Sequence, residues 1–202
     1  MSEAIATTTT RLATRTARVL RTHVLMLGVP LGVMWAVGAV NWVLDGLLAA
    51  YGVIPRSTLG LRGVVFAPFI HGSWNHLAAN SVPFLTLGWL ILLRETRHFI
   101  PITLLTMLGA GAGAWLFGAP GSVHIGASGV IFGYLGFLMV TGVFDRSILS
   151  ILLSILVTAV WGSLAQGVMP GQPGISWQAH LGGFVGGVFA AYFFRTARRK
   201  PL

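Results

Sequence analysis

Six apolar segments, each close to the length of a membrane-crossing helix, dominate this sequence. A transmembrane helix needs about 20 mainly apolar residues, and short runs of charge, proline or glycine separate the six segments. Because 55% of the chain is hydrophobic and only 8% is charged, too few ionisable side chains exist to coat a soluble globule. The sequence therefore predicts an all-α polytopic membrane protein with a six-transmembrane-helix bundle. Its helices are expected at about 23–44, 76–93, 100–118, 127–144, 148–166 and 178–195.

The remaining segments divide the chain around this bundle. The connection 45–75 mixes apolar and polar residues with prolines and glycines, and is expected to be a partly embedded loop with short helical turns. Residues 1–22 and 196–202 form basic tails flanking a six-helix domain at 23–195. The first tail superficially resembles a mitochondrial presequence because it is rich in Arg and Thr. The simpler expectation is a short disordered tail that anchors the first helix.

The positions of Lys and Arg predict the orientation of the bundle. Eleven of the thirteen basic residues fall on one side of the predicted membrane, and Arg56 and Arg62 fall on the other. The positive-inside rule then places both termini in the cytoplasm. The net charge of +9 reflects this topology and contacts with lipid head groups. It does not indicate nucleic acid, because the basic residues form no single patch interleaved with aromatic side chains.

Three of the apolar segments begin with polar residues that can meet at one depth. His76 and Asn80 open the second segment, Ser128 opens the fourth and His180 opens the sixth. These three segments all enter from the outer face in the predicted topology, so each polar group lies within about two turns of that surface at about 1.5 Å rise per residue. Ionisable groups inside a membrane are costly and are candidates for function.

This set of side chains permits acyl transfer. Ser128 is the candidate nucleophile, His180 the candidate general base, and His76 with Asn80 can donate hydrogen bonds to an oxyanion. Small residues at four-residue spacing on the fourth and sixth helices favour the close approach that such a site needs. These residues are Gly129 and Gly133 on one helix and Gly183 and Gly187 on the other.

Other intramembrane chemistries lack their residues in this chain. There is no His-Glu-x-x-His zinc motif, and Asp45 and Asp145, the two aspartates, lie near opposite membrane faces. Because no acid accompanies His180, a Ser-His dyad remains. Each residue alone is a weak signal, since a lone serine or histidine in a membrane helix usually has a structural role. The joint occurrence at one depth is what indicates a site.

The other histidines on the outer side carry less information. Metal binding by His71, His76 and His124 has no ligand spacing in its favour, so no metal or cofactor is expected. His124 is expected to be a solvated loop residue. The chain has no cysteine, which removes disulfides and a thiolate nucleophile from consideration.

The three polar stretches together resemble the motifs of the rhomboid intramembrane serine proteases of the compact six-helix bacterial type, over about residues 23–195. The His-x4-His-x3-Asn pattern is met by His71, His76 and Asn80. The Gly-x-Ser-Gly pattern is met by Gly126, Ala127, Ser128 and Gly129. The Ala-His-x2-Gly-x3-Gly pattern is met by Ala179, His180, Gly183 and Gly187.

The resemblance implies a function and a set of roles. Ser128 and His180 would form the dyad, and the Ser128 amide with His76 and Asn80 would form the oxyanion hole. Phe132 stands where the family often has a tyrosine stacked on the catalytic imidazole, and His71 would have a structural role near the mouth of the site. The implied activity is hydrolysis of peptide bonds in or near transmembrane helices of membrane-protein substrates. The implied place is the bacterial inner membrane, with the site opening to the outer face.

Alternatives to this function remain at the level of sequence. A catalytically silent rhomboid-like protein would bind membrane clients without cutting them, and a small transporter would use the same polar groups for a different purpose. The helix at 148–166 has few polar or glycine contacts in its middle and is the expected moving wall for substrate entry. Trp161 in its outer half is the candidate gate residue, against an ordinary interfacial tryptophan.

Overall fold

The computed structural model describes the backbone of residues 2–195 and the side chains of residues 14–195. This part of the chain is helical, with no strand beyond an isolated bridge between Val53 and His124. The prediction of an all-α polytopic bundle is confirmed. The six principal helices are α1 (Ser2–Val43), α3 (Trp74–Glu95), α4 (Phe99–Phe117), α5 (Ser128–Asp145), α6 (Ile148–Trp161) and α7 (Trp177–Phe193).

Four helical stretches of the described chain are long and apolar enough to cross a membrane. They are Thr14–Val43, Trp74–Phe117, Ser128–Asp145 and Ile148–Val168. The second stretch holds both α3 and α4, which are joined by the 3-10 turn η4 (Thr96–His98). Similarly, the fourth is α6 continued by the 3-10 segment η5 (Gly162–Val168). The remaining principal helix, α7, has 17 residues.

The first helix differs from the expectation of a disordered tail. Residues 2–22 are helical and continuous with the first apolar segment, so the expected boundary at residue 22 falls inside α1. No glycine or proline occurs between residues 2 and 27 to interrupt the helix, and the Ala, Arg and Leu residues of this stretch favour helix formation. The expected C-terminal tail at 196–202 lies outside the described residues, as do the side chains before residue 14.

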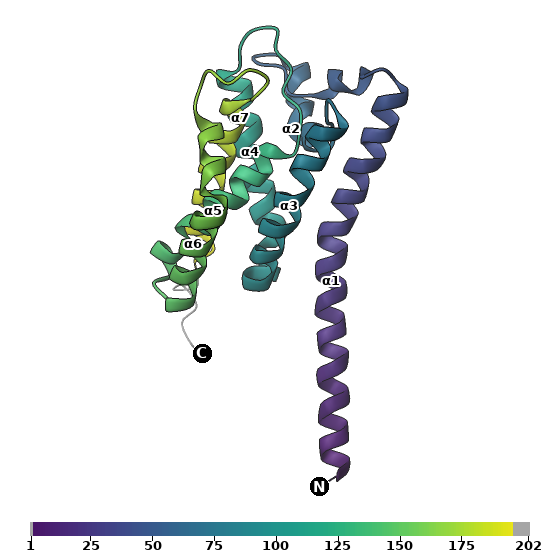
Figure 1. Cartoon of the computed structure of the whole chain (residues 1–202), viewed down its shortest axis with the longest axis vertical. Helices are drawn as coiled ribbons and strands as arrows, with labels where there is room; N and C mark the ends of the chain where they lie inside the picture. Colours follow the sequence, from purple (N-terminus) through teal and green to yellow (C-terminus); the bar gives the residue numbers. More distant parts are fainter. Residues whose placement is uncertain (1, 196–202) are drawn as a thin grey trace.

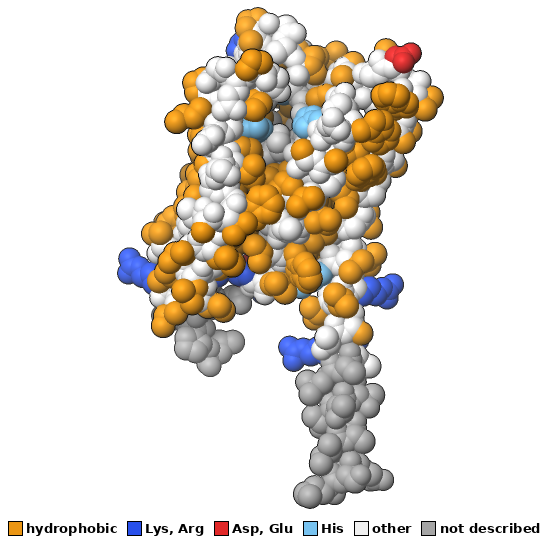
Figure 2. All heavy atoms as spheres, viewed as in Figure 1, with side chains coloured by type: hydrophobic (Ala, Val, Ile, Leu, Met, Phe, Trp, Pro, Cys, Tyr) orange, Lys and Arg blue, Asp and Glu red, His pale blue; other side chains and the backbone are white. Residues whose placement is uncertain are grey.

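Both described ends of the chain lie at one end of the bundle, which we call the inner end (Figure 1). The opposite, outer end carries the long connection between α1 and α3 and the loops that lead into α5 and α7. Most of the Lys and Arg side chains visible in Figure 2 lie toward the inner end, and hydrophobic side chains cover the flanks between the two ends. This distribution has the form that the positive-inside rule requires, and the cytoplasmic assignment of the termini stays a prediction.

The connection between α1 and α3 is built from short helical turns, as expected. These are η1 (Leu47–Tyr51), η2 (Leu59–Arg62), α2 (Gly63–Phe66) and η3 (Ala67–Phe69). Arg62 holds them together, because its guanidinium donates to the carbonyl of Ala50 at 3.0 Å and lies 4.3 Å from the centre of the Tyr51 ring.

Glycine backbones pack against one another where α7 meets its neighbours. Gly183 and Gly187 lie against the backbones of Gly129 and Gly133, leaving no room for a Cβ atom. The close approach of α5 and α7 therefore rests on these α7 glycines. Gly129 itself faces α4, since a Cβ atom there would lie 2.5 Å from that of Ala110.

A second seam joins α4 to α7 in the same way and was not anticipated from the sequence. Its residues are Gly109 and Gly113 on α4 and Gly182 and Gly186 on α7. Two glycine seams thus hold α4, α5 and α7 together as the rigid centre of the fold.

Candidate active site

Ser128 and His180 come together at the outer end of the bundle. Ser128 is the first residue of α5, and His180 lies in the first turn of α7. Their side chains are 2.8 Å apart, measured from Ser128 Oγ to His180 Nε2. The distance suits transfer of the hydroxyl proton to the imidazole. The glycine seam between α5 and α7 brings the two helix ends this close.

The other ring nitrogen of His180 reaches a backbone carbonyl. His180 Nδ1 lies 2.9 Å from the oxygen of Gly167, in η5. A carbonyl oxygen can only accept, so Nδ1 carries the proton and Nε2 is left to accept the Ser128 hydroxyl. Phe132 stacks on the imidazole with a ring-centre distance of 4.0 Å and an interplanar angle of 11°. Sequence patterns do not reveal Gly167, because no side chain marks a backbone carbonyl that accepts a hydrogen bond from a residue 13 positions away.

His76 and Asn80 line the same cavity as the serine and the histidine. This cavity of about 580 Å³ also includes Ser128 and His180 in its wall. Asn80 is 6% exposed, and its Nδ2 atom has no hydrogen-bond partner among the described residues. Gly126 has a φ of +111°, and a Cβ atom at that position would lie 2.8 Å from His76 Nε2. Glycine there leaves the space in front of the two donors open.

His71 holds the loop that precedes Ser128. The histidine is buried, and its Nε2 atom accepts a hydrogen bond from the backbone N–H of Ala127 at 3.3 Å. Burial, with a smaller contribution from the nearby His76, lowers the pKa of His71 to about 4. A neutral ring can accept this bond at neutral pH. Asn41 of α1 donates to the His71 carbonyl at 3.2 Å, which ties the arrangement to the first helix.

His124 is not the solvated loop residue expected from the sequence. Its Nδ1 atom lies 2.6 Å from Ser176 Oγ, and its Nε2 atom lies 2.9 Å from Ser122 Oγ. Its backbone also pairs with Val53 of the first connection. Ser176 caps α7 by accepting from the N–H of Ala179 at 3.4 Å. His124 therefore links three loops at the entrance to α7, contacts that its position in the sequence does not reveal.

Trp161 is the last residue of α6 and is partly buried against the hydrophobic core. It lies on the helix whose side chains are mostly exposed on the flank of the bundle. The next residues form η5, which carries the Gly167 carbonyl to His180. The gate residue predicted from the sequence thus directly precedes the segment that contacts the candidate base.

Comparisons with known proteins match the chain to one family model and to several relatives. The family model of the rhomboid domain matches residues 59–197. An uncharacterized protein of Mycobacterium tuberculosis is 42% identical over 83% of this chain and 73% of its own length. Another from Mycobacterium leprae is 43% identical over 69% of this chain and 59% of its own. Rhomboid-like protease 5 of Toxoplasma gondii is 33% identical over 67% of this chain, which spans 16% of that larger protein.

Proposed function

Because the chain belongs to the rhomboid family, we propose that it is an intramembrane serine protease that cuts membrane-protein substrates with a Ser128–His180 dyad. The observation that carries this proposal is the 2.8 Å contact between Ser128 Oγ and His180 Nε2 in a cavity that also holds His76 and Asn80. An apolar bundle has no structural need to bury an unpartnered amide beside a serine and two histidines.

The reaction follows from the positions of these groups. Ser128 Oγ attacks the carbonyl carbon of the scissile bond while His180 Nε2 takes the hydroxyl proton. The carbonyl oxygen becomes negative and accepts hydrogen bonds from the Ser128 N–H, His76 and Asn80. His180 then gives its proton to the leaving amine, and the peptide C–N bond breaks. Water attacks the acyl-enzyme in a second round of the same steps, which restores Ser128.

The protease domain in this proposal is the six-helix bundle at 23–195. Its cavity opens at the outer end, and the inner end with both termini faces the cytoplasm. The proposed location is a bacterial cell membrane, which agrees with the mycobacterial relatives. The substrates are other membrane proteins, cut in or near their transmembrane helices.

Labelling with a serine-directed fluorophosphonate tests the proposal. Purified protein in detergent is treated with the probe and digested, and the adduct is located by mass spectrometry. We expect a covalent adduct on Ser128 that forms far more slowly in His180→Ala. A folded protein with no adduct would instead be a catalytically silent binder of membrane clients.

A further inference from the structure

The inner half of α6 is fixed to the bundle by hydrogen bonds. Ser154 is buried, and its hydroxyl donates to the carbonyl of Leu138 at 2.7 Å and accepts from the N–H of Gly142 at 2.9 Å. Both partners belong to α5, so these bonds join the two helices directly. Val157, one turn further along, is the last fully buried residue of α6.

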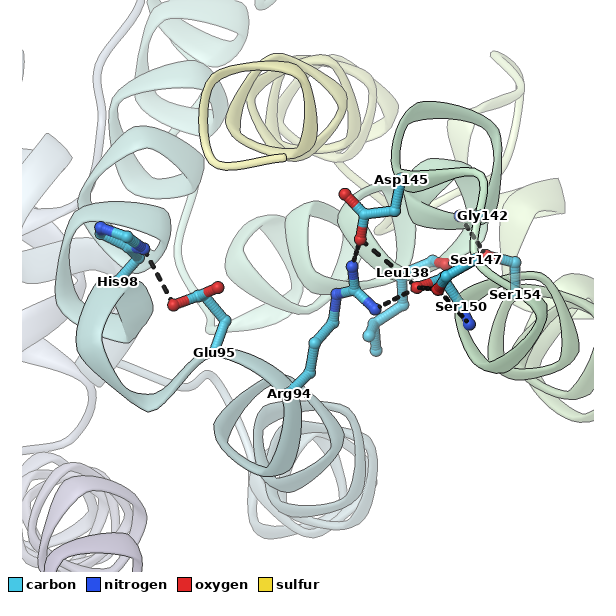
Figure 3. Close-up of polar contacts among 9 residues, drawn as sticks. All are labelled: Arg94, Glu95, His98, Leu138, Gly142, Asp145, Ser147, Ser150 and Ser154. Carbon is cyan, nitrogen blue, oxygen red and sulfur yellow. Dashed lines mark hydrogen bonds and ion pairs between the residues drawn. The ribbon is translucent and has the colours of Figure 1, made fainter. Parts of the chain in front are cut away.

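A buried polar cluster fixes the base of α6 more firmly still (Figure 3). Arg94, at the end of α3, forms an ion pair with Asp145 and donates to Ser150 Oγ at 2.7 Å. The Asp145 side chain is 2% exposed, and the cluster joins α3, α5 and α6. Breaking a buried ion pair by removing one partner is strongly destabilising. The base of α6 is therefore the fixed end of this helix.

The outer end of the same segment is held differently. Thr158 turns its hydroxyl back to the Ser154 carbonyl of its own helix. In the described part of the chain, the one side-chain hydrogen bond from residues 158–168 to α5 or α7 joins the Gly167 carbonyl to His180. Trp161 and Leu164 add apolar contacts with the core. Apolar contacts can separate and reform where a substrate helix or lipid replaces them, so this end can move.

We propose that the Gly167 carbonyl couples the lateral wall to the catalytic base, so that outward movement of α6 and η5 releases His180 and closure orients it again. The inference rests on the proposed protease function. When the wall is displaced, Nδ1 loses its acceptor, and the imidazole no longer directs an unprotonated Nε2 at Ser128. A substrate helix can then enter past the wall, and the base becomes oriented only after the wall has closed. Gly167 is thus a positioning residue that acts through His180.

The local packing explains why residue 167 is a glycine. A Cβ atom there would lie 2.6 Å from Phe132 Cζ and 3.1 Å from His180 Nδ1. The closed wall therefore touches both the imidazole and the ring stacked on it. Any outward shift of η5 changes both contacts at once, which makes the position of His180 sensitive to the wall.

Weakening the Gly167 carbonyl as an acceptor, without changing any side chain, tests the positioning role. Replacing Val168 by its α-hydroxy acid analogue turns the 167–168 amide into an ester, whose carbonyl is a poorer acceptor. We expect kcat for a short soluble peptide to fall about fivefold, the effect of one hydrogen bond, with KM unchanged. In ¹⁵N-histidine spectra, the His180 signal, assigned by its loss in His180→Gln, should shift toward a mixture of tautomers. The matched control is the same replacement at Gln166, which alters a carbonyl of η5 that does not bond to His180.

The coupling is tested by loosening the wall. Trp161→Ala should lower the rate of fluorophosphonate labelling and raise cleavage of a transmembrane substrate relative to that of the soluble peptide. The ester at Val168 should then have less effect in Trp161→Ala than in the wild-type protein, because the bond is already partly broken. Val160→Ala, which shortens an exposed neighbour, is the control. It should leave unchanged the labelling rate, the ratio of the two cleavage rates and the effect of the Val168 ester.

The outcomes separate this inference from the protease proposal. An unchanged His180 spectrum and kcat in the Val168 ester would overturn the positioning role, and an equal ester effect with and without Trp161 would overturn the coupling. Absence of labelling at Ser128 in the wild-type protein would overturn the protease function instead. The histidine spectrum needs no turnover and still reports the contact with Gly167.

Discussion

Two buried polar clusters, one at each end of the described bundle, differ in how completely their groups are paired. At the inner end, Arg94, Asp145 and Ser150 bond to one another and join three helices. At the outer end, Ser128 and His180 are bonded, but the Nδ2 atom of Asn80 has no partner among the described residues and faces a cavity of about 580 Å³.

This difference in pairing assigns the two clusters different roles, one in the stability of the fold and the other in its chemistry. A buried polar group without a partner costs folding free energy, whereas a paired group costs little and fixes geometry. The inner cluster is therefore suited to holding the fold. In the outer cluster, the Nδ2 donor of Asn80 has no partner among the described residues and can bond to an acceptor on another molecule. Substitutions in the two clusters should accordingly affect different properties.

The largest effect is expected in the outer cluster. Ser128→Ala and His180→Ala should each reduce cleavage of a transmembrane substrate by about 10⁴-fold or more, since members of such a dyad act as a unit. Thermal unfolding in detergent should fall far less than in variants of the inner cluster, because these side chains join their helices through neutral hydrogen bonds of about 1 kcal/mol each and not through a buried ion pair. If either variant keeps near-normal turnover, the dyad is assigned to the wrong residues.

The inner cluster should show the opposite pattern. Asp145→Asn removes the negative charge paired with Arg94, and the loss of one partner of a buried ion pair typically costs about 3–5 kcal/mol. We expect a large fall in unfolding temperature in detergent, while the molecules that remain folded label at Ser128 at the normal rate. Ser150→Ala, which removes a neutral partner, is the milder control. A stable Asp145→Asn with impaired labelling would show that the two clusters are not distinct in role.

The motif residues could be placed from the sequence because their positions depend on helix starts. His76, Ser128 and His180 each open an apolar segment, so depth in the membrane follows from counting residues. Gly167 could not be found this way, since its contribution is a backbone carbonyl. Arg94 and Asp145 stand at the ends of two segments that both enter from the outer face, but their pairing depends on how α3 packs beside α5, which no local pattern encodes.

The predicted oxyanion donors should give an intermediate effect on activity. His76→Ala and Asn80→Ala should each lower turnover by about 10²- to 10³-fold, the usual effect of removing one such donor. Stability should not fall in Asn80→Ala, because its unpartnered amide contributes no hydrogen bond to the fold. Unchanged rates in both variants would place the oxyanion hole elsewhere and leave the open donor without a role.

His124 offers the smallest and most specific test, because it stands beside the outer cavity but has both ring nitrogens paired. Because its polar atoms are paired, His124 should contribute to stability and not to activity, as the inner cluster does. His124→Ala should lower the stability of the fold by about 2 kcal/mol, since it removes two hydrogen bonds of about 1 kcal/mol each, and leave labelling of Ser128 nearly unchanged.

The pH dependence of stability identifies the His124 ring directly. Burial lowers the pKa of His124 below its ordinary value of 6.5, so the unfolded chain binds a proton more readily than the folded protein does. The stabilisation is therefore complete above about pH 6.5 and is lost as the pH falls toward the folded-state pKa. His71 contributes a loss of the same sign, so His124→Ala should reduce the slope without abolishing it. Unfolding temperatures at pH 7.5 and 5.5 measure this difference, and an identical slope in both proteins would return His124 to the solvated role that the sequence suggested.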